Sequence, residues 1–146
     1  METITKVKTM KTINATKGEL VQIINGLFQV QDLEGKRFSL IVSKNISILK
    51  EFLKDLEELG KPSEEFMKIA EKVNEIANKN EEDAKEQIDK IESDNQELVD
   101  ARRHQMDKVT KIMGEEAKVK LHIFKEDILP EKITAQQITN IMKIIE

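Results

Sequence analysis

The stretch from Lys36 to Met113 makes up about half of the chain, consists almost entirely of helix-forming residues and is visibly interrupted once, between Gly60 and Ser63. Gly60 can adopt the left-handed conformation that ends a helix, Pro62 cannot continue one, and Ser63 can cap the next. The pattern predicts a long antiparallel helical hairpin over residues 36–113. A hairpin of this kind implies no particular chemistry.

The first arm of this hairpin should be a helix from about Lys36 to Leu59, because its apolar residues recur every three or four positions and form a heptad seam. At about 1.5 Å per residue, such a helix would be roughly 36 Å long. Asn45 lies on the seam. Two interpretations of Asn45 stay open: it sets the register by hydrogen-bonding a partner, or it is simply partly exposed.

The second arm should begin at Ser63, but its apolar content falls between Asn78 and Gln96. An unbroken helix from Ser63 to Met113 would measure roughly 75 Å, about twice the length of its partner. We therefore predict an interruption near Asn78 to Asn80, where three acidic residues follow and favour a new helix start. A further helix should run from about Gln96 to Met113, and the apolar-poor segment before it indicates a binding partner.

Two capping boxes predict short helices on either side of the hairpin. Thr16 and Glu19 predict a helix from about Lys17 to Gln31, while Thr134 and Gln137 predict a C-terminal helix over residues 134–145. Apolar residues in both helices recur at the spacing of one helical face, which should pack on the rest of the domain. We also expect core packing for the methionines on apolar stripes, which are Met67, Met106, Met113 and Met142.

Two segments favour β structure. Apolar and polar residues alternate from Lys118 to Phe124, with His122 facing outward, as in a half-buried strand. Residues 1–15 alternate only weakly and fit either an N-terminal leader or an edge strand. Because one strand is not stable alone, residues 118–124 need the N-terminal strand or a second subunit. The predicted fold is mainly α (α+β), with residues 16–146 as a single helical domain that carries short flanking helices and a minimal two-stranded β element.

Composition argues against several classes of protein. The chain has no cysteine, so it has no disulfide, thiol nucleophile or thiolate metal site. It contains no apolar run long enough for a membrane span, and its start lacks the apolar region of a signal peptide. The 24 basic and 28 acidic residues are interspersed, and Trp and Tyr are absent, which makes nucleic acid an unlikely partner. These features fit a place of action inside the cell.

No catalytic constellation is recognisable in the sequence. His104 and His122 have no second ligand at zinc spacing, glycine-rich phosphate loops are absent, and the acidic pairs open helices. We predict no catalytic residue, no metal site and no cofactor, although one sequence does not reveal a site assembled across an oligomer interface. The candidates for holding a small anionic ligand or an acidic partner are Arg37, Arg102 and Arg103. The competing interpretation is a solvated face beside neighbouring acids.

Three stretches of the chain resemble small uncharacterised proteins encoded by tailed bacteriophages and prophages. They are the early amphipathic helix, Gly35–Ser39 leading into Val42–Asn45, and Ile128–Thr134. The likeness covers about Lys11 to Ile145. It implies a phage origin, sometimes beside tail or other structural genes, without an established activity and without any functional residue.

The leading hypothesis is therefore a non-catalytic bacteriophage protein that acts by protein–protein interaction, in the virion or its assembly. It would act in the cytoplasm of the infected bacterium or in the virion, and we expect it to form a homo-oligomer. The alternative is an anti-defence protein that inhibits a host immune protein or sequesters a small nucleotide, with the three arginines as its binding residues.

Overall fold

The computed structural model of this chain describes residues 10–146. These residues form seven α-helices, two short 3-10 helices and one two-stranded antiparallel sheet, which confirms the mainly helical α+β fold class. They divide into two compact units. Unit 1 takes in the chain up to Asp55 and from Ile112 onward, and unit 2 consists of Leu56–Lys111.

The sheet of unit 1 pairs β1 (Met10–Thr16) with β2 (Glu116–His122), and Ile13 lies opposite Val119. The predicted strand is thus confirmed, although it begins and ends two residues earlier than expected. Its partner is the N-terminal strand. Of the segment 1–15, residues 10–15 form strand, while residues 1–9 lie outside the described residues. The inward-facing side chains of both strands are buried, and they are Ile13, Ala15, Val119 and Leu121.

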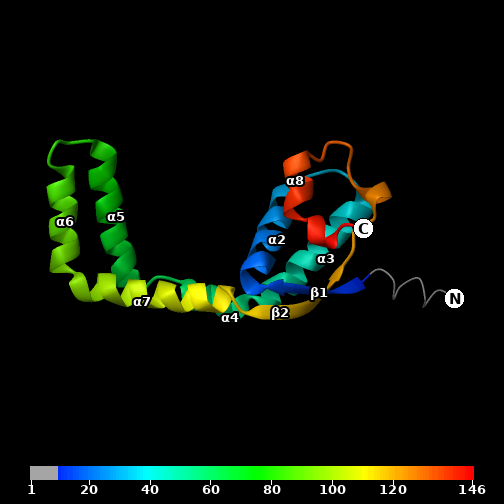
Figure 1. Cartoon of the computed structure of the whole chain (residues 1–146). Helices are drawn as coiled ribbons and strands as arrows, with labels where there is room; N and C mark the ends of the chain where they lie inside the picture. The colour runs from blue at the N-terminus through cyan, green and yellow to red at the C-terminus, as the bar shows by residue number, and fades with distance from the viewer. Residues whose placement is uncertain (1–9) are drawn as a thin grey trace. The chain divides into compact units, whose positions relative to one another are not determined.

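Three helices of unit 1 complete the core around this sheet (Figure 1). They are α2 (Lys17–Val30), α3 (Lys36–Phe52) and α8 (Ala135–Asn140). Helix α2 packs against α3, α8 and β1, while α3 packs against β2. The rings of Phe38 and Phe124 lie 5.0 Å apart at the centre of this core. Its other fully buried apolar side chains are Leu20, Leu27, Val30, Val42, Leu49, Leu121, Ile141 and Ile144.

Local hydrogen bonds fix the starts of α2 and α8 in unit 1. Both predicted capping boxes are present, the first between Thr16 and Glu19 and the second between Thr134 and Gln137. Helix α8 is shorter than the predicted 134–145 helix and is followed by the 3-10 helix η2 (Met142–Ile144). A second 3-10 helix, η1 (Glu126–Ile128), lies in the connection that leads to α8.

Asn45 joins α3 to β2 and decides between the two interpretations of this residue. Its side chain is fully buried. The amide nitrogen donates to the carbonyl of His122 at 2.9 Å, and the amide oxygen accepts from the His122 N–H at 2.8 Å. The Asn45 side chain thus imitates a neighbouring strand and fixes the position of α3 along β2.

Unit 2 contains most of α4 (Lys54–Gly60) and α7 (Gln96–Met113), and all of α5 (Glu64–Lys79) and α6 (Ala84–Asp94). Helices α5 and α6 are antiparallel and lie side by side (Figure 1). Ser63 caps α5 by accepting a hydrogen bond from the Phe66 N–H at 3.1 Å, as predicted. The predicted interruption near Asn80 is also confirmed, because Asn80 adopts the left-handed conformation with φ of 52°.

The single hairpin predicted for residues 36–113 is wrong in its pairing. The first arm ends at Phe52, and a new short helix begins at Lys54. The apolar seam of α3 packs against α2 and β2 of unit 1, so it is covered without a second hairpin arm. The packed helical hairpin is instead α5–α6, joined at Asn80. The predicted further helix from Gln96 to Met113 is confirmed as α7, and just before it the Asn95 side chain donates to the Ile91 carbonyl at 2.8 Å.

The expectation of core packing also fails for three methionines. Met67 is 49% exposed, Met106 is 40% exposed and Met142 is 53% exposed. For Met67 and Met106 the reason is architectural, because the helices of unit 2 form too thin a layer to enclose their apolar sides. Within residues 10–146, no helix has both the length and the apolar character needed to cross a bilayer.

Candidate interaction surface

The three predicted arginines belong to two different units of the chain. Arg37 is exposed in the first turn of α3 and belongs to unit 1, whereas Arg102 and Arg103 lie on α7 in unit 2. Arg103 is exposed, and its guanidinium lies 3.8 Å from the Asp100 carboxylate. Each of the three therefore has its own surroundings.

Arg102 is engaged in holding the turn between α4 and α5. Its guanidinium donates to the carbonyl of Gly60 at 2.8 Å and to the side chain of Gln105 at 2.9 Å. The amide of Gln105 in turn donates to the carbonyls of Leu59 and Lys61, both at 2.6 Å. The last carbonyls of a helix lack partners within it, so these two side chains complete the hydrogen bonding of α4.

The Arg102 guanidinium also lies over the ring of Phe66, 5.7 Å from its centre. Its carbonyl and cation–π contacts thus connect α7 with both sides of the turn. The sequence offered no sign of this role, because Gln105 is separated from its partners by more than forty residues. Arg102 is a structural residue of unit 2, and its hydrogen-bonding capacity is already partly used.

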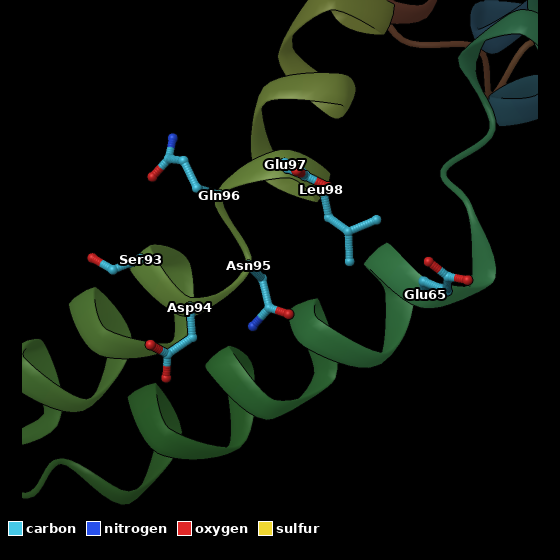
Figure 2. Close-up of a pocket in the computed structure, with 7 residues that line it drawn as sticks. All are labelled: Glu65, Ser93, Asp94, Asn95, Gln96, Glu97 and Leu98. Atoms are coloured by element: carbon cyan, nitrogen blue, oxygen red, sulfur yellow. The ribbon is translucent and has the colours of Figure 1, made fainter.

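A cleft of unit 2 lies where α6 meets α7 and is bordered by Glu65 of α5 (Figure 2). Its other lining residues are Ser93, Asp94, Asn95, Gln96, Glu97 and Leu98. The lining provides carboxylates, amides and a hydroxyl without a histidine, lysine or arginine. Among residues 10–146, no group of three or more His, Cys, Asp or Glu side chains is placed to hold a metal ion. This cleft lacks a paired base and nucleophile.

Neither histidine is among the residues that line this cleft. His104 is exposed on α7. His122 is partly buried at the end of β2, and burial lowers the pKa of its imidazole, with a further contribution from the nearby charge of Lys44. A lowered pKa keeps His122 neutral, which is consistent with its place beside the buried amide of Asn45.

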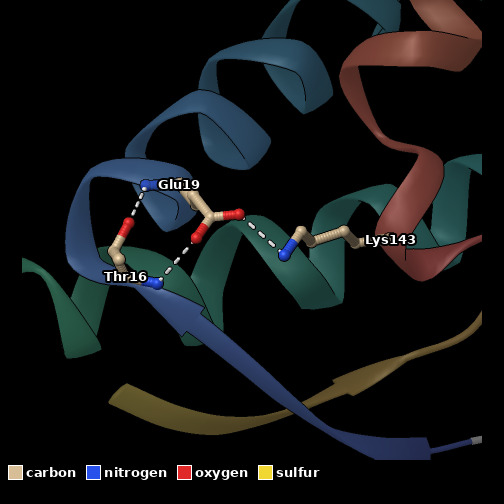
Figure 3. Close-up of polar contacts among 3 residues, drawn as sticks. All are labelled: Thr16, Glu19 and Lys143. Atoms are coloured by element: carbon tan, nitrogen blue, oxygen red, sulfur yellow. Dashed lines mark hydrogen bonds and ion pairs between the residues drawn. The ribbon is translucent and has the colours of Figure 1, made fainter. Parts of the chain in front are cut away.

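A second polar cluster connects the start of α2 with the C-terminal segment (Figure 3). The Glu19 carboxylate accepts from the Thr16 N–H at 3.1 Å and lies 2.7 Å from the Lys143 ammonium. The bond from Lys143, followed by that from the Thr16 N–H, lowers the pKa of the Glu19 carboxyl. The cluster is exposed and fully paired, so its evident role is to fix the chain.

The apolar residues of the α5–α6 hairpin form the surface that stands out in unit 2. No side chain of α5 or α6 is fully buried. We call the following apolar residues, which lie on more than one side of the hairpin, the hairpin surface: the exposed Met67 and the half-buried Ile69, Val73, Ile76, Ile88 and Ile91. At about 100° per residue, Met67 lies roughly on the opposite side of α5 from Ile69 and Ile76. Of these residues, Met67 was expected from the sequence to pack in a core.

The hairpin surface can bind another protein, because two helices that pack mainly on each other leave much of their apolar area in contact with water. Charged residues on the remaining faces keep such a hairpin in solution. Comparisons with protein-family models, with curated proteins and with solved structures found no match for this chain. The function is therefore argued from the residues themselves.

Proposed function

We propose that this chain is a non-catalytic bacteriophage protein that acts by protein–protein interaction, in the virion or during its assembly. The phage origin rests on the resemblance of three stretches to small proteins of tailed phages. The observation that supports an interaction is the hairpin surface. Its apolar side chains belong to α5 and α6, and no side chain of these two helices is fully buried.

The energetic argument concerns what a partner would gain by covering this surface. Burying an exposed side chain the size of Met contributes about 1.5–3 kcal/mol, and Met67 is 49% exposed. Half-buried isoleucines and valines around the hairpin add to that gain when a partner helix covers them. Apolar residues spaced along a helix are the anchors of helix-in-groove contacts. A partner with an apolar helical face or groove is the best match.

The experiment compares two exposed apolar positions in the two units. Met67→Lys adds a charge to the hairpin surface, and lysine is as good a helix former as methionine, so unit 2 should keep its helicity. Leu40→Lys is the matched control, because Leu40 is 54% exposed on α3 of unit 1. We expect the complex isolated from infected cells to be lost with Met67→Lys and kept with Leu40→Lys. Equal recovery with both variants would reject the hairpin surface as the contact.

The alternative function, an anti-defence protein, shares the hairpin surface if its target is a protein. Capture of a small nucleotide by the three arginines has less support, because the Arg102 guanidinium already donates hydrogen bonds to the Gly60 carbonyl and to the Gln105 side chain. Replacing Arg37 and Arg103 with Ala tests that reading without disturbing the turn held by Arg102. Nucleotide binding that is unchanged by this double substitution rejects the arginine site.

A further inference from the structure

Strand β1 has one paired edge and one open edge. The sheet has two strands, and within residues 10–146 no strand pairs with the second edge of β1. Lys11, Thr12 and Asn14 are exposed there. The outer edge of β2 is different, because the Asn45 side chain occupies it at His122 and Phe124 pairs with Ile145 just beyond. Nearer the middle of the sheet, β2 carries Lys118 and Lys120, whose charges oppose pairing with a further strand, so β1 is the edge without such protection.

The hydrogen bonds identify which backbone groups point out of this edge. His122 gives its N–H and C=O to Asn45, on the side away from β1, so its opposite residue Met10 also turns its groups outward. The same alternation directs the N–H and C=O of Thr12 and Asn14 away from β2. The next alternate residue, Thr16, agrees, because its outward N–H is bonded to Glu19 at 3.1 Å.

The open edge lacks the usual protection against strand pairing. Natural edge strands are blunted by proline, bulges or unpaired charges. The sequence of β1 is MKTINAT, which contains no proline, no glycine and no acidic residue. Its one charged residue, Lys11, is paired with Glu146 at 3.0 Å. The outward side chains Thr12 and Asn14 are neutral and can form hydrogen bonds.

We propose that β1 docks antiparallel on β1 of a second copy, so that two two-stranded sheets join into one sheet of four strands. The strand is self-complementary about Ile13, as a two-fold interface requires. In that register Ile13 faces its own copy, Thr12 faces the partner's Asn14, and Lys11 faces the partner's Ala15. No like charges are opposed, and each Thr12–Asn14 pair exchanges both main-chain hydrogen bonds.

A second copy fits this edge better than an unrelated extended peptide does. The edge carries no unpaired charge that would select an acidic or basic peptide. Pairing with β1 of a second copy gives a hydrogen-bond partner to every outward N–H and C=O of Thr12 and Asn14. A two-stranded sheet is marginal, and four strands are an ordinary number. This self-association uses unit 1 only and deepens the expected homo-oligomer. It is independent of the hairpin surface, so either can fail without the other.

The test is sedimentation of the full chain over a range of micromolar concentrations, with charges introduced at Thr12 and Asn14. We expect the unaltered chain to be a dimer. The variant carrying Thr12→Glu with Asn14→Glu should be monomeric, and so should the variant carrying Thr12→Lys with Asn14→Lys. Because the new lysines also lie opposite Lys120 and Lys118 of β2, circular dichroism must first show that both variants fold like the unaltered chain. An equimolar mixture of the two should restore the dimer, because opposite charges then face each other across the edge.

Two further variants separate the edge from general effects on folding. Thr12→Pro removes one outward N–H, and proline is tolerated on an edge strand with that group facing solvent, so the chain should fold and be monomeric. Asn78→Lys with Thr110→Lys makes the same changes at exposed helical positions and should leave the dimer intact. An unaltered chain that stays monomeric overturns the proposal. So does an oligomer that survives both charge variants and Thr12→Pro.

Discussion

The substitution Asn45→Ala tests the joint between α3 and β2. The Asn45 amide is fully buried and makes hydrogen bonds of 2.9 Å and 2.8 Å to the C=O and N–H of His122. Alanine keeps the helix but removes both partners of the His122 backbone. The two peptide groups are then left without a protein partner at the end of the sheet.

The magnitude follows from these two lost bonds. A buried donor or acceptor left without a partner costs about 1–3 kcal/mol, so two such groups would cost about 2–6 kcal/mol. Because His122 is only partly buried, water can reach part of its backbone, and the lower part of the range, about 2–4 kcal/mol, applies. For a chain of this length that corresponds to a decrease in melting temperature of roughly 5–15 °C.

The assay is urea unfolding followed by circular dichroism, with hydrogen exchange of the β2 amides to locate the change. The matched control is Asn25→Ala, because Asn25 is exposed on α2 of the same unit and should change the free energy of unfolding by less than about 0.5 kcal/mol. If Asn45→Ala changes the free energy of unfolding as little as Asn25→Ala does, the reasoning about the contact between α3 and β2 is refuted.

Three other perturbations have defined outcomes. Gly26→Val should lower the free energy of unfolding by about 1–3 kcal/mol, since a Cβ on Gly26 would lie 2.9 Å from the Cβ of Asn140. Chemical denaturation measures this change, and an unchanged midpoint would contradict the close packing of α2 against Asn140. Burial and a neighbouring charge hold the pKa of His122 below its usual 6.5, so protons favour the unfolded chain, and stability should fall as the pH drops below about 6.5. His122→Gln should flatten that part of a stability–pH curve, and an unchanged slope would count against it. The pKa of Glu19 lies below its usual 4.5, so its contribution to folding stability is present above that pH and is lost as the pH falls through the lowered pKa. Lys143→Gln should weaken this loss of stability in acid in the same titration. Identical stability–pH curves for the variant and the unaltered chain would disprove the pairing.

Local signals in the sequence predicted the ends of several helices well. The capping residues Thr16, Ser63 and Thr134 each accept the expected hydrogen bond, because a cap depends on residues only three positions apart. The interruption at Asn80 was also predictable, since a single uninterrupted helix would have been too long for its partner. The alternation of β2 indicated a strand with its apolar side inward.

Long-range pairing was less predictable. An apolar seam such as that of α3 indicates that another element covers the helix, but it does not identify that element. The sequence alone is compatible with a neighbouring hairpin arm as well as with α2 and β2. The hydrogen bonds from Arg102 to Gly60 and from Gln105 to Leu59 join residues more than forty positions apart, and no local pattern records them. The buried Asn45 was recognised as unusual, yet its partner at His122 required the folded structure.

The candidate surfaces were anticipated only in part. Sequence analysis expected a partner for the apolar-poor segment near Asn80 and a role for three arginines. The exposed Met67 was assigned to the core, because periodicity alone does not tell how many helices form a layer. The open edge of β1 became apparent only when the two strands and their hydrogen-bond alternation were in place.

The most direct test of the central claim is the copy number of this chain in purified phage particles and in assembly intermediates, measured by quantitative mass spectrometry. Our account predicts a fixed ratio to the other structural proteins in at least one of them. It also predicts that Met67→Lys lowers this ratio and that Leu40→Lys leaves it unchanged. Absence of the unaltered chain from both particles and intermediates would contradict the proposed role in the virion and its assembly.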